Sequence, residues 1–333
     1  MKNMEKEKGH KMDFLTQFNG FIEKWMALVT PACLIMGILC ADWLSHFSFL
    51  VTGLFAFMTF TGSLGSNFKD MGRIAKHPIP LVTVLILLHV VMPLIAFGVG
   101  RALFGQDMDL VTGIVLEFLV PTGIVSLAWV NIYGGHSALT ISIIVIDTLL
   151  APFMVPLMLH GLLGSVVEMA PWGMMQQLVF MIALPALAAM ALNQWTMGRV
   201  SQSWKPRLAP FSKLALIGVV TINSTRIAPY MTSLTPTLIA VAGCILGLAI
   251  FGYIAALGMS RVLHLDGPDT ISVMYNGGMR NISAGAVIAA QYFPSEVLFP
   301  VMIGTLFQQV IAAGAGMMIV RMPWFSRGIS SSH

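Results

Sequence analysis

The sequence predicts an all-α polytopic membrane protein with ten transmembrane helices arranged as two inverted five-helix repeats. Hydrophobic residues make up 57% of the chain and charged residues only 10%, whereas soluble domains carry about 25% charged residues. Apolar stretches long enough to cross a bilayer recur along the whole chain. Two of these stretches are interrupted by helix breakers, at the same place in each half.

Ten apolar segments reach the roughly 20 residues that a membrane-spanning helix needs. The longest connection between them, Thr196–Pro210, is too short for a soluble domain. The expected spans are Trp25–Leu44, Phe47–Gly65, Pro80–Phe104, Asp109–Gly134, Ser137–Leu162, Trp172–Trp195, Phe211–Tyr230, Pro236–Leu263, Pro268–Tyr292 and Glu296–Val320.

The positive charges predict the orientation of these spans. With the N-terminus inside, fifteen Lys and Arg residues fall on inner segments, and only Arg101 and Arg226 fall outside. Cytoplasmic loops carry the excess of Lys and Arg. Both termini are therefore expected in the cytoplasm, in a multi-pass protein of the cytoplasmic (inner) membrane. The basic balance reflects topology, so no nucleic-acid partner is expected.

Four regions follow from this count. Residues 1–24 are expected to form a cytoplasmic tail with a short interfacial helix. Residues 25–162 hold the first five spans and residues 172–320 the second five, followed by a cytoplasmic tail at 321–333. Because five is an odd number, the second set is inverted relative to the first. The interrupted segment is the fourth span of each set.

The two interruptions place Gly, Pro and polar residues where a span should cross the bilayer centre. Unwound backbone at that depth is tolerated only inside protein or beside a cavity, and paired interruptions point to the binding site of a secondary transporter. The half-helices starting near Ser126 and Met279 are expected to attract an anion. The alternative is that these residues only allow close helix packing. The expected helix breaks are Pro121, Gly123, Gly277 and Gly278.

Four ionisable side chains fall within expected spans, where such groups are costly and usually functional. Arg280 lies inside the second break and is the candidate for binding an anion. Asp147 is expected to pair with Arg280 in at least one transport state, the alternative being that it carries a proton. Glu117 and His89 are candidates for coupling or for structural hydrogen bonds. Three further polar residues are expected only to pack helices together: Asn223, Gln308 and Gln309.

At its two interruptions the chain resembles the bile acid:sodium symporter family, and the resemblance runs from about Met26 to Val320. The family patterns Pro-Gly-Gly-x-x-Ser-Asn and Glu-x-Gly-x-Gln-Asn correspond to residues 121–127 and 276–281. The resemblance implies a panel domain of spans one, two, six and seven. It also implies a core domain of spans three to five and eight to ten, in which spans four and nine cross. Elevator-type alternating access and an organic anion substrate are implied as well.

The resemblance also implies two Na⁺ ions at the crossing, but this chain departs from the family at most of the ligand positions. Ser126 and Thr140 keep a side-chain oxygen, whereas an apolar or guanidinium side chain offers Na⁺ no acceptor. Coupling to Na⁺ is therefore not favoured, and the charge of Arg280 is expected to replace a sodium ion. The degenerate positions are His89, Ser126, Leu127, Thr140, Ile144, Asn276 and Arg280.

Together these features predict a secondary active transporter of a small organic anion without conventional Na⁺ coupling. Two alternatives stay open: a Na⁺-coupled symporter with a degenerate site, and a non-transporting membrane sensor or scaffold. Neither an enzyme activity nor a cofactor is expected, because the chain offers no His-Glu-x-x-His zinc motif. The expected partners are the anion and the bilayer, and a homodimer is left open. The expected substrate-binding residues are Ser126, Thr140, Asn276, Gly277, Gly278, Arg280 and Asn281.

Overall fold

The computed structural model describes residues 29, 32–68, 78–164, 170–232 and 235–322. These residues form helices joined by short connections, with no strand among them. The expected tail at 1–24, the expected tail at 321–333 except its first two residues, and most of the first seven residues of the first span lie outside the described residues. The described helical residues of that span are 29, 32–39 and 41–44.

Six helices of the described residues are long and apolar enough to cross a membrane, and a seventh candidate is Ala41–Phe47 with Leu50–Ser63, bent by 64°. This confirms a multi-pass, all-helical membrane protein. Two further expected spans, Asp109–Gly134 and Pro268–Tyr292, are each divided into shorter helices, and the remaining one, Trp25–Leu44, is described at residue 29 and from residue 32 onwards. The six are Pro78–Phe104, Ser137–Leu163, Pro171–Trp195, Arg199–Tyr230, Pro236–Val262 and Ser295–Val320.

The chain divides into two compact units. The first comprises residues 1–68 and 180–228, and the second comprises residues 69–179 and 229–333. In the first unit α12 packs against α3 and α11, and the buried Leu64 contacts Ala189 and Val200. The described elements of this unit are α2 (Ala41–Leu44), η1 (Ser45–Phe47), α3 (Leu50–Ser63), α11 (Leu184–Trp195), α12 (Arg199–Ser224) and η4 (Thr225–Ile227).

The structure corrects the expected loop at Thr196–Pro210. The turn is limited to residues 196–198, where Met197 and Gly198 have φ angles of 51° and 84°, and α12 starts at Arg199. The polar composition of this segment predicts a loop. The residues continue as a helix because Leu208 packs beside Leu64 while the charged side chains stay exposed.

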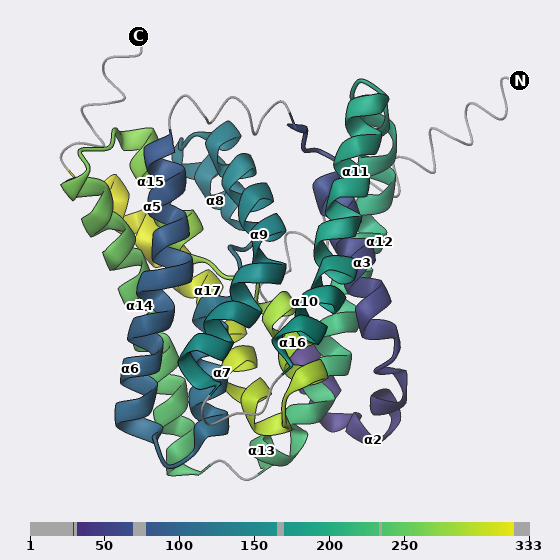
Figure 1. Ribbon diagram of the computed structural model, residues 1–333, viewed down its shortest axis with the longest axis vertical. Coiled ribbons are helices and arrows are strands. Elements are labelled where there is room, and N and C mark those ends of the chain that lie inside the picture. The colour runs from purple at the N-terminus through teal and green to yellow at the C-terminus, as the bar shows by residue number, and fades with distance from the viewer. Residues whose placement is uncertain (1–28, 30–31, 69–77, 165–169, 233–234, 323–333) are drawn as a thin grey trace, which may run out of the picture. The chain divides into compact units, whose positions relative to one another are not determined.

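The second unit holds both interrupted spans. There α7 packs against α6 and α17, and α14 packs against α15 and α17 (Figure 1). Its elements are α5 (Pro78–Ile86), η2 (Leu87–Val91), α6 (Met92–Phe104), α7 (Met108–Leu119), α8 (Ser126–Tyr133), α9 (Ser137–Leu163), α10 (Pro171–Leu178), α13 (Ala228–Thr232), α14 (Pro236–Val262), α15 (Gly267–Gly278), α16 (Ile282–Tyr292) and α17 (Ser295–Val320). The element η3 (Val179–Ala183) crosses the boundary between the units.

Two π-helical turns, η2 and η3, widen long helices at similar places. Each is followed two residues later by a proline, Pro93 or Pro185. Proline lacks an N–H group, so the carbonyl four residues earlier loses its helical partner and the turn there is disturbed. For Pro93 that earlier residue is His89, which lies in the middle of the π turn.

Candidate functional site

The two interrupted spans touch each other at their breaks. Helix α7 ends at Leu119 and α8 begins at Ser126. The two breaks are joined by a backbone hydrogen bond, in which the N–H of Asn281 in the second break donates to the carbonyl of Pro121 in the first at 2.8 Å. A Cβ atom on Gly123 would lie 2.9 Å from the carbonyl oxygen of Arg280. The first break therefore needs glycine at position 123, because the backbones approach so closely.

The second break differs from its prediction, because Gly277 and Gly278 are the last two residues of α15 and not part of the unwound segment. The unwound residues are 279–281, and Asn281 caps α16 by accepting from the N–H of Ala284. The two glycines serve packing: an added Cβ would lie 2.6 Å from a side-chain carbon of Leu87 or from the ring of Tyr253.

Three of the expected substrate residues meet at the first Na⁺ position implied by the resemblance. The hydroxyl of Ser126 donates to Asn276 Oδ1 at 3.1 Å. Asn276 Nδ2 donates to Thr140 Oγ1 at 3.2 Å and to the carbonyl of Ser272 at 2.8 Å. All three side chains are fully buried. The amide of Asn276 therefore links Ser126 on α8 to Thr140 on α9. Ile144 is buried and brings only carbon atoms.

Aromatic rings hold α8 against α15 beside this group. The rings of Trp129 and Tyr133 stack on Tyr275, with centroid separations of 6.0 and 5.9 Å. The hydroxyl of Tyr275 donates to the carbonyl of Ala312 on α17. Since Tyr275 and Asn276 are neighbours in α15, this stack fixes the helix turn that carries the Asn276 amide.

Arg280 lies within the second break, and its side chain is only 3% exposed. Its Nη1 atom donates to the carbonyls of Gly277, at 2.7 Å, and Met279, at 3.1 Å. The guanidinium carbon lies 5.9 Å from the ring centroid of Phe118, while Nε has no partner among the described residues. The guanidinium therefore caps the carbonyl end of α15, where the helix dipole favours a positive charge.

The expected ion pair between Arg280 and Asp147 is not formed in this structure. Instead, Asp147 Oδ1 lies 2.6 Å from His89 Nε2, and Oδ2 accepts from the backbone N–H of Thr122 at 2.6 Å. His89 is 2% exposed and Asp147 is 0% exposed. The prediction missed this pair because it depends on the contact of η2 with α9, which no spacing within span five reveals.

Glu117 is buried beside Gly304 of α17, where an added Cβ would collide with its Oε1 atom. Its Oε2 atom has no partner in the described part of the chain. Glu117 and Asp147 both lie within electrostatic range of Arg280, and no ion pair with Arg280 is formed by either of them among the described residues. The sequence assigned this role to Asp147 alone, whereas the structure places two buried carboxyl groups near Arg280.

Two residues of the site were missed by the sequence reasoning. Gln308, expected only to pack helices, accepts from the backbone N–H of Arg280 at 2.8 Å and so holds the second break to α17. Thr122 supplies the N–H bound by Asp147, and its own hydroxyl is buried without a described partner. A signal for Gln308 was present, because a polar pair at Gln308 and Gln309 is unusual in an apolar span.

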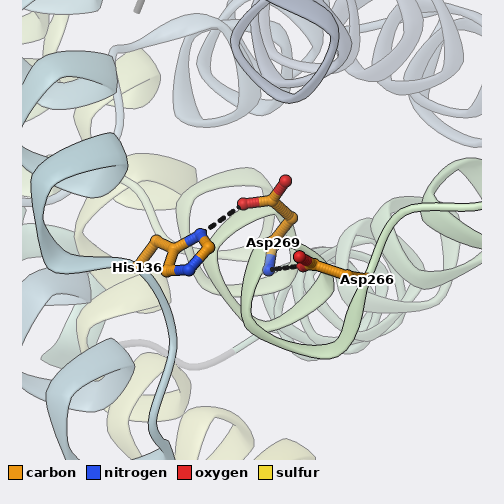
Figure 2. Close-up of side chains that lie close together, drawn as sticks. All are labelled: His136, Asp266 and Asp269. Atoms are coloured by element: carbon orange, nitrogen blue, oxygen red, sulfur yellow. Dashed lines mark hydrogen bonds and ion pairs between the residues drawn. The ribbon is translucent and has the colours of Figure 1, made fainter. Parts of the chain in front are cut away.

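A second polar group lies apart from the breaks, where α9 and α15 begin (Figure 2). His136 Nδ1 lies 2.7 Å from Asp269 Oδ1, and Asp266 Oδ1 accepts from the N–H of Asp269 at 2.8 Å. One nitrogen or oxygen atom from each of these three side chains lies within 4.8 Å of the other two. His136 is 53% exposed. Asp266 is the N-cap residue of α15, and His136 directly precedes α9. The contact of His136 with Asp269 therefore joins the start of α9 to the start of α15, so the group has a structural role in both helices.

The long apolar helices and the two touching breaks define a polytopic membrane protein with two interrupted helices in its second unit. The family model described as "Sodium Bile acid symporter family" matches residues 51–234. The chain belongs to this family, which is a family of transporters and not of enzymes, and the resemblance seen in the sequence is confirmed.

Three relatives are similar over much of the chain. "Uncharacterized protein YbaS" of Bacillus subtilis (strain 168) is 42% identical over 296 residues, covering 89% of this chain and 97% of that protein. "Uncharacterized sodium-dependent transporter YocS" of the same organism is 20% identical over 284 residues, covering 85% and 86%. "Probable sodium/metabolite cotransporter BASS1, chloroplastic" of Oryza sativa subsp. japonica is 26% identical over 224 residues, covering 67% and 54%.

Proposed function

We propose that this protein is a secondary active transporter that moves an organic anion across the cytoplasmic membrane without conventional Na⁺ coupling. The observation that carries the proposal is the position of Arg280, whose guanidinium donates to the carbonyls of Gly277 and Met279. A coupling ion binds and leaves during each cycle. A guanidinium is always charged and covalently attached, so it satisfies these carbonyls without drawing on an ion gradient.

The first Na⁺ position supports the same proposal. Ser126 and Thr140 would contribute hydroxyl oxygens, but both are hydrogen-bonded to the amide of Asn276. Leu127 and Ile144 add no oxygen. A hard cation needs several oxygen ligands, preferably including a carboxylate. We therefore propose that the residues at this position do not fit Na⁺, and that the neutral amide closes the site instead.

An elevator-type mechanism needs two bodies that can move separately, and the division of the chain into two compact units supports it. We propose ten spans in two inverted repeats, with both termini in the cytoplasm, the first unit as panel and the second as core. The paired breaks at α7–α8 and α15–α16 would then be the fourth and ninth spans. Unwound segments in corresponding places of two repeats form the substrate sites of many secondary transporters.

We propose that the anion binds at the N-termini of α8 and α16, with Arg280 as a fixed positive charge behind them. Ile124 and Val125, which precede α8, are 47% and 46% exposed. Helix N-termini attract anions through free N–H groups and the helix dipole. Arg280 itself is buried and bound to carbonyls, so its charge would act at a distance in this conformation.

The second candidate is Na⁺-coupled transport through a degenerate site. It is favoured by the printed names of two relatives, one a "sodium-dependent transporter" and one a "sodium/metabolite cotransporter". Under this alternative, backbone carbonyls and Asn281 would hold the ion. A non-transporting sensor is the remaining alternative, and it would bind an anion without moving it.

Exchange of radiolabelled taurocholate in proteoliposomes separates these candidates, since its sulfonate stays ionised. We expect equal exchange rates in NaCl and in choline chloride at constant ionic strength. The variant Arg280→Gln should lose at least tenfold in exchange, whereas the exposed Arg101→Gln should retain it. A several-fold rate increase specific to Na⁺ would establish the second candidate. Taurocholate binding without exchange would establish the sensor.

A further inference from the structure

We infer that the buried His89–Asp147 pair binds one proton that is transported together with the anion. The inference rests on the proposed function, because it names the coupling ion that replaces Na⁺. It starts from the shortest contact between ionisable side chains at the breaks, 2.6 Å between His89 Nε2 and Asp147 Oδ1.

The geometry of His89 suits a group that gains and loses a proton. Its Nε2 atom is bound to Asp147, while its Nδ1 atom is buried without a partner among the described residues. A neutral imidazole can donate from Nε2 and keep Nδ1 bare, and a second proton on Nδ1 makes the ring cationic. The bond to Asp147 persists in both forms. Because Nδ1 is shielded from water, proton exchange requires a conformational change that opens this part of the second unit.

Charge balance explains why a proton should bind here together with the anion. Glu117 is buried and its Oε2 atom has no partner among the described residues, which favours the neutral carboxyl group. The charged groups at the breaks are then Arg280 and Asp147, whose charges cancel while His89 is neutral. Protonation of His89 leaves one positive charge in excess. A buried charge without a partner is unfavourable, and a bound organic anion would balance it, so protonation of His89 should favour anion binding.

This coupling must act in both directions. If the proton raises the affinity for the anion by some factor, the anion raises the affinity for the proton by the same factor. One proton would then accompany one anion. A histidine is suited to this role because its charge changes within the physiological pH range.

Few other titratable groups face the pair from the helices packed against α9. Glu117 on α7 and Arg280 after α15 belong to the charge group described above. The remaining groups lie towards helix ends or already have partners: Arg101 is bonded to Met108 Sδ, Asp269 to His136, and Tyr275 to the carbonyl of Ala312. Asp109 lies in the first turn of α7, and Tyr133 in the aromatic stack. Within their described lengths, α8 and α10 contain no acidic or basic side chain.

The exposed pair His136–Asp269 provides a matched control within the same chain (Figure 2). It has nearly the same separation, 2.7 Å against 2.6 Å. His136 is 53% and Asp269 21% exposed, so water reaches this pair directly. Changes that act merely by removing a His–Asp contact should affect both pairs alike. Changes that act on a transported proton should affect only His89 and Asp147.

The first experiment needs no substrate. Protein labelled with ¹⁵N-histidine is placed in Na⁺-free nanodiscs, and the His89 signal is identified by its loss in His89→Gln. Over a pH series we expect both the neutral and the protonated His89 ring in the wild type, and only the neutral ring in Asp147→Asn. A His89 ring with one protonation state over the whole series, both alone and with taurocholate, would overturn the inference.

The second experiment tests coupling in proteoliposomes that contain a pH-sensitive dye and only choline salts. An inward taurocholate gradient should acidify the lumen in the wild type and in the controls His136→Gln and Asp269→Asn. His89→Gln and Asp147→Asn should reduce acidification at least tenfold relative to the taurocholate exchange that each variant retains. Taurocholate uptake by the wild type without acidification would refute proton coupling. If taurocholate is not moved at all, the proposed function fails for this anion, and the first experiment alone decides whether the pair binds a proton.

Discussion

Replacing Arg280 by Met tests whether the guanidinium holds the second break. Methionine has a similar length but donates no hydrogen bond. The change removes the two bonds to the carbonyls of Gly277 and Met279, and it removes a positive charge that lies within electrostatic range of Glu117 and Asp147. Removing one partner of a buried charge pair costs about 3–5 kcal/mol. We therefore expect the free energy of unfolding to fall by about that amount.

A double-mutant cycle separates the charge interaction from the lost hydrogen bonds. In the Glu117→Gln background no carboxylate is left unpaired, so Arg280→Met should cost about 1–3 kcal/mol less than in the wild type. Unfolding by SDS in mixed micelles, followed by the fluorescence of the seven tryptophans, provides the measurement. The exposed Arg101→Met serves as the control and should stay within about 0.5 kcal/mol of the wild type.

Two results would refute this reasoning. If Arg280→Met is as stable as the control variant, the bonds to the α15 carbonyls do not hold the break. If the effects of Arg280→Met and Glu117→Gln are simply additive, the two residues do not interact, and Glu117 is not the opposite charge of Arg280.

Three further predictions concern packing, ion dependence and topology. Gly304→Ala should lower the free energy of unfolding by about 1–3 kcal/mol, because the added Cβ collides with Glu117. The control Gly314→Ala on the same helix places its Cβ in open space and should leave stability unchanged. Identical unfolding curves for the two variants would contradict this prediction. The double variant Asn276→Glu/Arg280→Gln should gain Na⁺-specific taurocholate binding, and unchanged binding in NaCl and choline chloride would show that other positions block the ion. Cysteines placed in either terminal tail should react only with reagent supplied from the cytoplasmic side, and labelling of one tail from outside would exclude an even number of spans.

The sequence predicted the first break more accurately than the second. Pro121 cannot donate a helical hydrogen bond, so its position alone indicates where α7 must end. Gly277 and Gly278 were read as breakers by the same logic, but glycine also permits close packing. Their true role depends on Leu87 and Tyr253, which are distant in the sequence and meet them only in the fold.

The partners of the buried charged side chains could not be predicted from sequence patterns for a related reason. Periodicity along span five placed Asp147 on a face with Thr140, but it said nothing about the helix opposite that face. His89 reaches Asp147 from the π turn that precedes Pro93. Helical spacing rules assume a regular helix, so they cannot predict the direction of a side chain in a π turn.

The two breaks show why fixed charges matter in this protein. A break leaves backbone N–H groups at the start of one half-helix and carbonyl groups at the end of the other without helical partners. At the first break a carboxylate, Asp147, binds an N–H group of Thr122. At the second break the Arg280 guanidinium binds the carbonyls of Gly277 and Met279. Side chains of opposite sign thus satisfy opposite ends of the unwound backbone. Since Arg280 is permanently charged, the pair that contains His89 is the member of this arrangement for which we propose a change of charge during transport.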